Sequence, residues 1–277
     1  MPWLRGLPSL LRMKPVLVLF MAGVILAGSA AAQRNRFQRS LPTNPKYDGA
    51  FQFCRIVFRQ NPYGDGNGWS VDYPRADINF PYRLSELTTT TVSKDSRGDG
   101  NHLLLLLTDP EIFRCPFMML TEPGGAYFDE QEAAKLREYL LKGGFLWADD
   151  FWGERAWESW VEQVRKAFPE SSFQIADLPP AHPIFHELYQ VDRVPQIPSI
   201  GAWGGPGGGT SERGAGSAVP HARGLTDAKG NVMLLMTFNT DFGDAFEREG
   251  DDRAYFETFA AVGYAFGINA WLYAMTH

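Results

Sequence analysis

Residues 129–153, DEQEAAKLREYLLKGGFLWADDFWG, combine a helix pattern with a strand pattern that follows it directly, and this order is the main indication of the fold class. Asp129 followed three residues later by Glu132 is a capping-box pattern, which marks the start of a helix. The glycine pair at 143–144 supplies the backbone conformation that ends a helix. Residues 145–148 are then continuously apolar, as in a strand that is covered on both faces. The segment therefore predicts a helix that leads directly into a central strand.

Neighbouring segments repeat this alternation. An amphipathic helix is predicted after the strand, because apolar residues recur there at three- and four-residue spacing, at Trp157, Trp160, Val161, Val164 and Phe168. Further strands are predicted at 51–58, 102–108, 117–121, 172–176 and 231–238, and further helices at 76–90 and 253–276. Alternating strands and helices are typical of an α/β domain with a mainly parallel sheet. We predict one such domain over residues 49–277.

The last predicted helix, 253–276, has only two charged residues, Arg253 and Glu257. The glycines at 263 and 267 have a spacing that favours close pairing of helices in a membrane. An α/β core, however, also needs a helix that is apolar nearly all round. We favour the buried helix, because the uncharged stretch 258–276 is of borderline length for a membrane span.

The N-terminus has the pattern of a secretory signal. Three basic residues precede a short apolar run at 16–27, and small residues follow up to Ala32. This order predicts a signal peptide over 1–32, cleaved after Ala32, and a polar linker over 33–48. The domain is then expected in the periplasm or outside the cell, with membrane contact only through its N-terminal segment. The alternative is an uncleaved inner-membrane anchor.

The charge balance of the chain is acidic. The formal net charge is −6 at pH 7, and cleavage after Ala32 would remove three basic residues and no acidic one, which leaves −9. Binding to nucleic acid depends on clustered cations that neutralise phosphates. We therefore expect no nucleic-acid partner.

The chain contains two cysteines, Cys54 and Cys115. An oxidising compartment would permit a disulfide between them. Both lie in or beside apolar strand-like segments, where free buried cysteines are common. We therefore favour two free thiols over a bridge.

Two further motifs are interpreted as structural. Residues 201–217 are too rich in glycine to pack a core, and they predict a mobile surface loop rather than a phosphate-binding loop, because no helix pattern follows at the required place. His182 and His186 have the spacing of a zinc-binding pair, but Pro183 lies between them and no glutamate accompanies them. We predict a turn in which one histidine makes a structural hydrogen bond.

Acidic residues follow several of the predicted strands and form the candidate site. The carboxyl ends of parallel strands converge on the ligand site of an open α/β sheet. The candidate ligand-binding residues are Glu122, Asp149, Asp150, Trp152, Asp241 and Asp244, with Asp109 at the end of the leucine-rich strand and Trp147 as an alternative apolar contact. A divalent cation is the candidate cofactor, because Ca²⁺ and Mg²⁺ prefer carboxylate oxygens. Its candidate ligands are Asp149, Asp150 and Asp241.

Two other roles for these carboxylates stay open. Two carboxyl groups held close together have one pKa raised, which suits acid–base catalysis. An aspartate at the start of a helix is also favoured as an N-cap, and Asp150, Asp251 or Asp252 could have only that role. The chain contains no Gly-x-Ser-x-Gly or Gly-x-Cys-x-Gly motif, which argues against a hydrolase that forms an acyl-enzyme.

Five segments in order resemble the bacterial family DUF4159. They are GWSVDYPRADINFPYRLSELT (68–88), GGFLWADDFWG (143–153), HPIFHELY (182–189), FNTDFGDAFE (238–247) and GINAWLYAMTH (267–277). The resemblance, over about residues 50–277, implies a flavodoxin-like three-layer α/β/α sandwich similar to class I glutamine amidotransferases. In those amidotransferases a cysteine nucleophile follows the central strand, where this chain has Asp149 and Asp150. The resemblance also implies partners among envelope proteins encoded beside a MoxR-type ATPase.

Two functions, and a purely structural role as an envelope scaffold, are consistent with these observations. The one we favour is a non-catalytic module of the cell envelope that binds a ligand or a protein partner at the acidic carboxyl edge of its sheet. The alternative is a carboxylate- or metal-dependent hydrolase of glycan or amide bonds.

Overall fold

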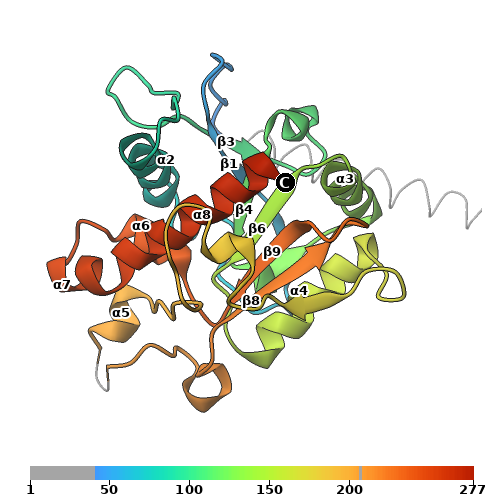
Figure 1. Ribbon diagram of the computed structural model, residues 1–277. Helices are drawn as coiled ribbons and strands as arrows, with labels where there is room; N and C mark the ends of the chain where they lie inside the picture. The colour runs from blue at the N-terminus through green and yellow to red at the C-terminus, as the bar shows by residue number, and fades with distance from the viewer. Residues whose placement is uncertain (1–40, 206–207) are drawn as a thin grey trace, which may run out of the picture. The chain divides into compact units, whose positions relative to one another are not determined.

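A seven-stranded sheet forms the centre of the computed structural model, which describes residues 41–205 and 208–277 (Figure 1). Across the sheet the strands are β3 (His102–Leu105), β1 (Phe53–Ile56), β4 (Phe117–Thr121), β6 (Phe145–Asp149), β9 (Val232–Phe238), β8 (His221–Thr226) and β7 (Ile175–Asp177). The first five are parallel, and β8 and β7 are added antiparallel. In chain order the parallel strands lie 2-1-3-4-5, which is the flavodoxin-like arrangement. The predicted fold class is confirmed.

The described residues from Asn44 to His277 form one compact unit. The expected signal peptide or anchor, 1–32, lies outside the described residues, as does the first part of the expected linker, 33–40. Over 41–205 and 208–277, no helix is long and apolar enough to cross a membrane.

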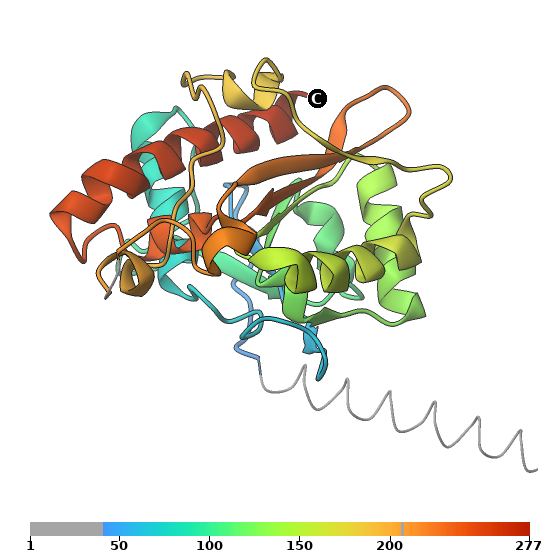
Figure 2. The same ribbon diagram turned by 90° about the horizontal axis from the view of Figure 1, so that it is seen from below.

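Three helices, α2 (Arg75–Leu87), α6 (Phe242–Glu247) and α8 (Ala261–Thr276), cover one face of the sheet (Figure 2). Their apolar side chains form one core with the strands, in which Phe80 and Phe266 are fully buried. Trp147 of β6 packs edge-on against Phe242, with ring centroids 5.1 Å apart. This core therefore fixes the start of α6 beside the end of β6.

The C-terminal helix lies within this core, as the sequence predicts. It runs from α7 (Arg253–Tyr255) through a π-helical turn (Phe256–Ala260) into α8. A Cβ atom at Gly263 would lie 2.9 Å from the Cβ of Ala245, so the glycine permits close packing of α8 on α6. The small residues of this helix thus serve packing inside the domain.

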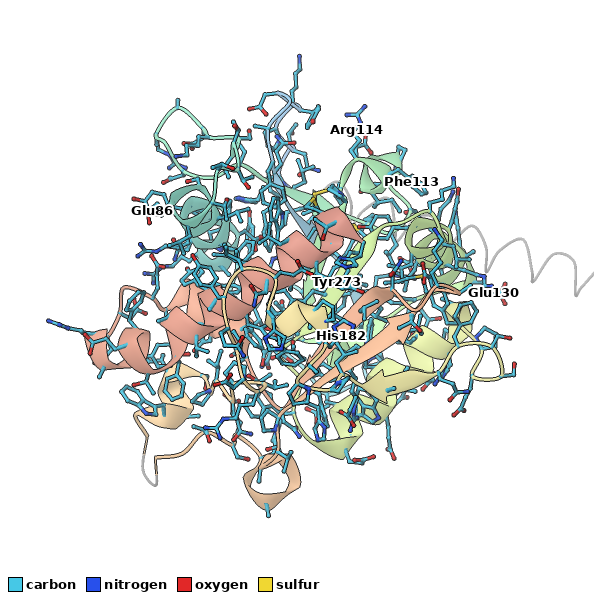
Figure 3. The ribbon with its side chains drawn as sticks, viewed as in Figure 1. Glu86, Phe113, Arg114, Glu130, His182 and Tyr273 are labelled. Atoms are coloured by element: carbon cyan, nitrogen blue, oxygen red, sulfur yellow. A yellow bond between two sulfur atoms is a disulfide. The ribbon has the colours of Figure 1, made fainter. Side chains whose placement is uncertain are left out.

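The two histidines at 182 and 186 flank a short 3₁₀ helix, η3 (Pro183–Phe185). The Nδ1 atom of His182 accepts a hydrogen bond from the Ile184 amide at 3.3 Å, and the His186 ring lies 2.6 Å from the Pro180 carbonyl. In Figure 3, His182 lies beside Tyr273 of α8, and their ring centroids are 5.3 Å apart. The predicted structural role of this histidine pair is confirmed.

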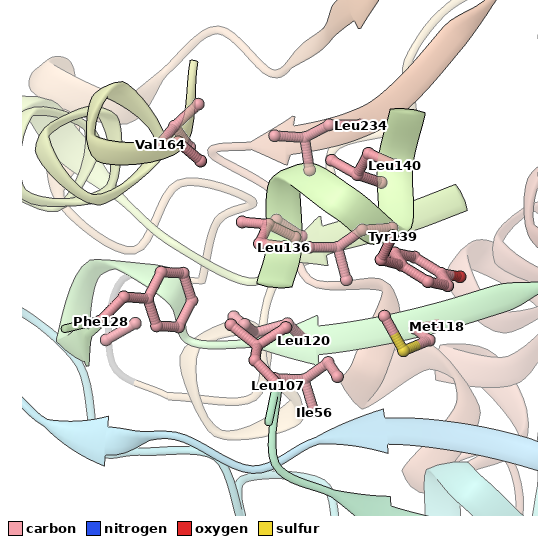
Figure 4. Close-up of a cluster of buried hydrophobic side chains, with 14 of the residues drawn as sticks. Ile56, Leu107, Met118, Leu120, Phe128, Leu136, Tyr139, Leu140, Val164 and Leu234 are labelled. Atoms are coloured by element: carbon pink, nitrogen blue, oxygen red, sulfur yellow. The ribbon is translucent and has the colours of Figure 1, made fainter. Parts of the chain in front are cut away.

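Helices α3 (Glu130–Leu141) and α4 (Gly153–Ala167) cover the other face. The predicted capping box is confirmed, because the Asp129 side chain accepts from the Glu132 amide and the Glu132 side chain accepts from the Asp129 amide, both at 2.9 Å. Figure 4 shows Leu136 of α3 above Leu120 of β4 and Ile56 of β1. The sheet is therefore covered on both faces, as in a three-layer sandwich.

Some elements are not predicted by the sequence. Strand β8, HARGLT, has no continuous apolar pattern, and pairing with both β9 and β7 compensates for this. The six-residue helix α6 is too short for a helical period to be recognised. The remaining short elements are β2 (Arg59–Gln60) paired with β5 (Ala126–Tyr127), η1 (Pro110–Arg114), η2 (Pro123–Gly125), α5 (Ile200–Trp203) and η4 (Gly214–Ser217).

The expectation of two free thiols is wrong. Cys54 and Cys115 form a disulfide, with their Cα atoms 6.2 Å apart. Cys54 lies in β1 and Cys115 directly precedes the segment that enters β4, and these strands are neighbours in the sheet. Pairing of strands far apart in the chain brings the two sulfur atoms together, and the local sequence pattern carries no sign of it.

Candidate functional site

A cavity of about 400 Å³ opens at the carboxyl edge of the sheet. Its walls come from the loop before α2, the residues after β4, β6 and β9, and the loop that follows α5. Eight carboxylates line it, Asp65, Asp72, Glu122, Asp150, Glu212, Asp241, Asp244 and Glu247, against two guanidinium groups, Arg213 and Arg248. The cavity is therefore strongly acidic.

The strand ends at this edge share an unusual backbone conformation. Glu122, Asp150 and Asn239 directly follow β4, β6 and β9, and their φ angles are 54°, 61° and 60°. Asp72, in the loop before α2, has a φ of 64°. These are the four non-glycine residues with positive φ among those that the structure describes. Left-handed backbone is unfavourable for side chains other than glycine and concentrates at functional sites.

Three of the carboxylates converge. Oxygen atoms of Asp72, Asp150 and Asp241 lie within 4.8 Å of one another, and the three residues are only 6%, 5% and 3% exposed. We refer to these three residues as the aspartate trio. Their separation is small enough for a single bound ion to contact all three.

The carboxylates of the trio accept few hydrogen bonds from the surrounding protein. Oδ1 of Asp150 accepts from Nε1 of Trp152 at 2.9 Å, and Oδ1 of Asp241 accepts from the Asp244 amide at 2.6 Å. Oδ2 of Asp72 is buried and has no hydrogen-bond partner among the described residues. Buried polar atoms are normally paired, so this orphan oxygen calls for a ligand or a proton.

Burial raises the pKa of each member of the trio well above its ordinary value. The next largest cause for Asp150 and Asp241 is repulsion from neighbouring carboxylates, Glu122 and Asp150 respectively. For Asp72 the Arg55 charge opposes the effect of burial, and Asp244 adds to it. Ionisation of all three groups together is therefore unfavourable unless a cation is present.

Asp149, one of the three predicted cation ligands, does not belong to the trio. Its carboxylate accepts from the Thr237 hydroxyl and from the amides of Phe242 and Gly243 at 2.8 and 2.9 Å. Burial, opposed by these hydrogen bonds, raises its pKa to about 7. Asp149 is the last residue of β6 and its carboxylate contacts the start of α6, whereas Asp150 follows the strand with a φ of 61° and lines the cavity.

The two candidate tryptophans also differ. Trp152 lines the cavity and donates to Asp150, whereas Trp147 is fully buried and donates to the Thr237 hydroxyl at 2.7 Å. Trp147 therefore belongs to the core and is not a ligand contact.

Asp150 is not a helix cap, because α4 begins at Gly153 with Trp152 as its N-cap residue. Asp252 does have the predicted capping role, since it accepts from the Tyr255 amide.

Asp72 is the member of the aspartate trio that the sequence did not predict. It follows no strand, and its position depends on Arg55, a fully buried residue of β1. The Arg55 guanidinium donates to the carbonyls of Trp69 and Val71 at 3.2 and 3.1 Å and pairs with Asp77 of α2 at 2.6 Å. Arg55 thus holds the loop that carries Asp72. The one signal in the sequence that could have indicated this arrangement is an arginine in the middle of an apolar strand-like segment, 51–58.

Of the other predicted acids, Glu122 and Asp244 line the cavity and Asp109 does not. Glu122 lines the cavity and accepts from the Asn67 side chain at 3.1 Å, and burial raises its pKa to about 7. Asp244 also lines the cavity, and burial raises its pKa to about 6. Asp109 is not part of the cavity wall, and its carboxylate accepts from the Leu106 amide at 2.9 Å.

The glycine-rich segment contributes more than the predicted surface loop. Glu212 and Arg213 line the cavity. Glu212 accepts from the Ser199 amide at 2.6 Å, and Arg213 pairs at 3.0 Å with Asp65 of the loop before α2. This ion pair joins two loops at the rim. Its side chains are partly exposed, so its contribution to stability is small.

The profile of a family described as Domain of unknown function (DUF4159) matches residues 57–275. The matched range contains all the carboxylates of the cavity. No curated protein shows a significant match to the chain.

Proposed function

The chain belongs to the DUF4159 family, and we propose that this member is a non-catalytic binding module whose aspartate trio takes up a divalent cation. The observation that carries the proposal is the convergence of three buried carboxylates, one of which has an oxygen without a partner. Ca²⁺ and Mg²⁺ are bound by such sets of carboxylate oxygens. A bound cation would also remove the repulsion that makes the ionised trio unfavourable.

The composition of the cavity favours binding over nucleophilic catalysis. An activated serine, threonine or cysteine needs an adjacent base, usually a histidine. Ser70 and Ser199 line the cavity, but no histidine or cysteine is among its lining residues in the described chain. Asp150, at the strand end where the resembling amidotransferases carry cysteine, is available as a cation ligand.

The cation would present coordination positions to the open side of the cavity. Ca²⁺ takes six to eight oxygen ligands, more than the three carboxylates supply singly. We infer that a hydroxyl- or carboxylate-bearing ligand of the cell envelope completes the coordination. An exported location is part of the proposal, and the Cys54–Cys115 disulfide supports it because such bonds persist in oxidising compartments. Envelope proteins associated with a MoxR-type ATPase are the proposed partners.

Calorimetric titration of the full chain with Ca²⁺, Mg²⁺ and Mn²⁺ tests the cation site. Wild type is expected to bind at least one of these ions, and Asp150→Asn is expected to lose measurable binding. Asp192→Asn is the matched control, since Asp192 is exposed and lies outside the cavity wall. Absence of cation binding in wild type, or equal binding in Asp150→Asn, would refute the proposal. Envelope glycan fragments titrated with and without the cation then test the ligand.

One observation favours a second function, metal-assisted hydrolysis. Glu122 and Asp244 have pKa values raised to about 7 and about 6, so each can exchange a proton near neutral pH beside the trio. Turnover of glycan or amide substrates that requires the cation and is lost in Glu122→Gln would establish it. Lack of turnover across such a screen would leave the binding function.

A further inference from the structure

We propose that the cavity holds two divalent cations and that Asp72 bridges them, an inference that rests on the proposed cation-binding function. A second group of carboxylates, Asp72, Asp244 and Glu247, also has oxygen atoms within 4.8 Å of one another. Asp72 is common to this group and to the aspartate trio. The two groups therefore form adjacent sites that share one ligand.

Two of the three members of the second group lie on α6. Asp244 and Glu247 are three residues apart, a spacing that places two side chains next to each other on a helix. Asp244 is 5% exposed, and the Glu247 side chain is 14% exposed. The pair therefore lies at the inner wall of the cavity, facing the loop that carries Asp72.

The Asp72 carboxylate has the unused lone pairs that a bridging ligand needs. Its Oδ2 atom is buried without a hydrogen-bond partner, and its carboxylate makes no salt bridge among the described residues. An ionised carboxylate has two oxygens and about four lone-pair sites, so it can contact two ions at once. The nearby Arg55 is already paired with Asp77 and does not neutralise this carboxylate by contact.

The local charge balance calls for more than one divalent ion. Five carboxylates, Asp72, Asp150, Asp241, Asp244 and Glu247, surround the two sites, and among the described residues Arg248 is the one cation in a salt bridge with any of them. With all five ionised the formal charge is −4, so one divalent ion leaves −2 and a second brings the cluster to neutrality. Burial makes uncompensated charge costly, so the second ion has a strong electrostatic reason to bind.

Arg248 distinguishes the second site from the first. Its Nε atom lies 2.8 Å from Glu247 and 3.4 Å from Asp244, and its side chain is 36% exposed. It therefore offsets part of the negative charge of the second group, whereas no salt bridge to the trio occurs within the described part of the chain. We expect the second cation to bind more weakly than the first.

Titration of the full chain with Mn²⁺, followed by electron paramagnetic resonance, tests the inference. Wild type is expected to bind two Mn²⁺ ions whose spectra show coupling at saturation. Glu247→Gln is expected to bind one ion, uncoupled, with the affinity of the tighter site unchanged. Arg248→Gln is expected to tighten the weaker site by roughly tenfold, the effect of one unit charge a few ångströms away in water-like surroundings.

The matched control is Glu249→Gln, which removes a carboxylate two residues further on that pairs with Arg83 outside the cavity. It should retain both coupled ions. A single Mn²⁺ in wild type that is lost in Asp150→Asn would overturn the two-ion inference and leave the proposed function standing. No Mn²⁺ binding at all would overturn both, and two ions unaffected by Glu247→Gln would overturn the assignment of the second site. Wild-type coupling is measured without any substitution, so the test does not depend on the folding of a variant.

Discussion

Replacing Glu122 by glutamine is expected to stabilise the cation-free protein at alkaline pH and to have little effect at acid pH. Burial raises the pKa of this carboxyl group from 4.5 to about 7 in the folded protein. A change of one pKa unit corresponds to about 1.4 kcal/mol, so the full effect is about 3 kcal/mol. Glutamine keeps an oxygen that can accept the hydrogen bond from Asn67, so the substitution removes the titration and little else.

The direction of the change in stability with pH depends on whether the folded or the unfolded chain ionises first. Below pH 4.5 the carboxyl group is protonated in both the folded and the unfolded chain, and the variant and wild type have similar stability. Between pH 4.5 and about 7 the unfolded chain ionises before the folded one, so wild type loses stability as the pH rises. Above pH 7 the loss is complete. The variant does not ionise and should be more stable there by about 3 kcal/mol.

Urea unfolding of both proteins in a chelating buffer, at several values between pH 4.5 and 8, measures this difference. The exposed residue Glu170 provides the control, and Glu170→Gln should follow wild type across the range. A Glu122→Gln variant whose stability relative to wild type does not change with pH would show that the pKa of Glu122 is not raised by burial. A saturating divalent cation should reduce the difference, because a nearby positive charge favours the ionised carboxylate.

Three further predictions concern the frame of the site. Arg55→Met is expected to lower the free energy of unfolding by about 3–5 kcal/mol in urea titration, because it leaves the buried Asp77 unpaired; a loss below about 1 kcal/mol would contradict the role of Arg55 in holding the loop that carries Asp72. Replacing Cys54 and Cys115 together by serine is expected to cost about 4 kcal/mol in the same assay, from the chain entropy of a 61-residue separation; unchanged stability would argue against the bond. Gly243→Ala would place a Cβ atom 2.1 Å from Oδ2 of Asp72, so calorimetry should show weakened cation binding in a folded protein, and unaltered affinity would contradict this packing.

The central elements of the fold were predictable because their signals are local. The capping box at 129–132, the apolar strands β4 and β6 and the amphipathic helix α4 each follow from residues within one short window. Strand β8 could not be predicted in this way, because its stability comes from pairing on both edges. The disulfide likewise depends on two strands that become neighbours only in the sheet.

The candidate site was likewise predictable only in part. The order of residues along the chain places acids after the parallel strands, and the rule that strand ends converge was sufficient to predict that Asp150 and Asp241 lie together. The hydrogen bonds of Asp149 to the start of α6, and the place of Asp72 in the trio, depend instead on contacts between distant segments. Asp72 is positioned by hydrogen bonds from Arg55 to the loop carbonyls, and contacts between distant parts of a chain leave no periodic pattern in the sequence.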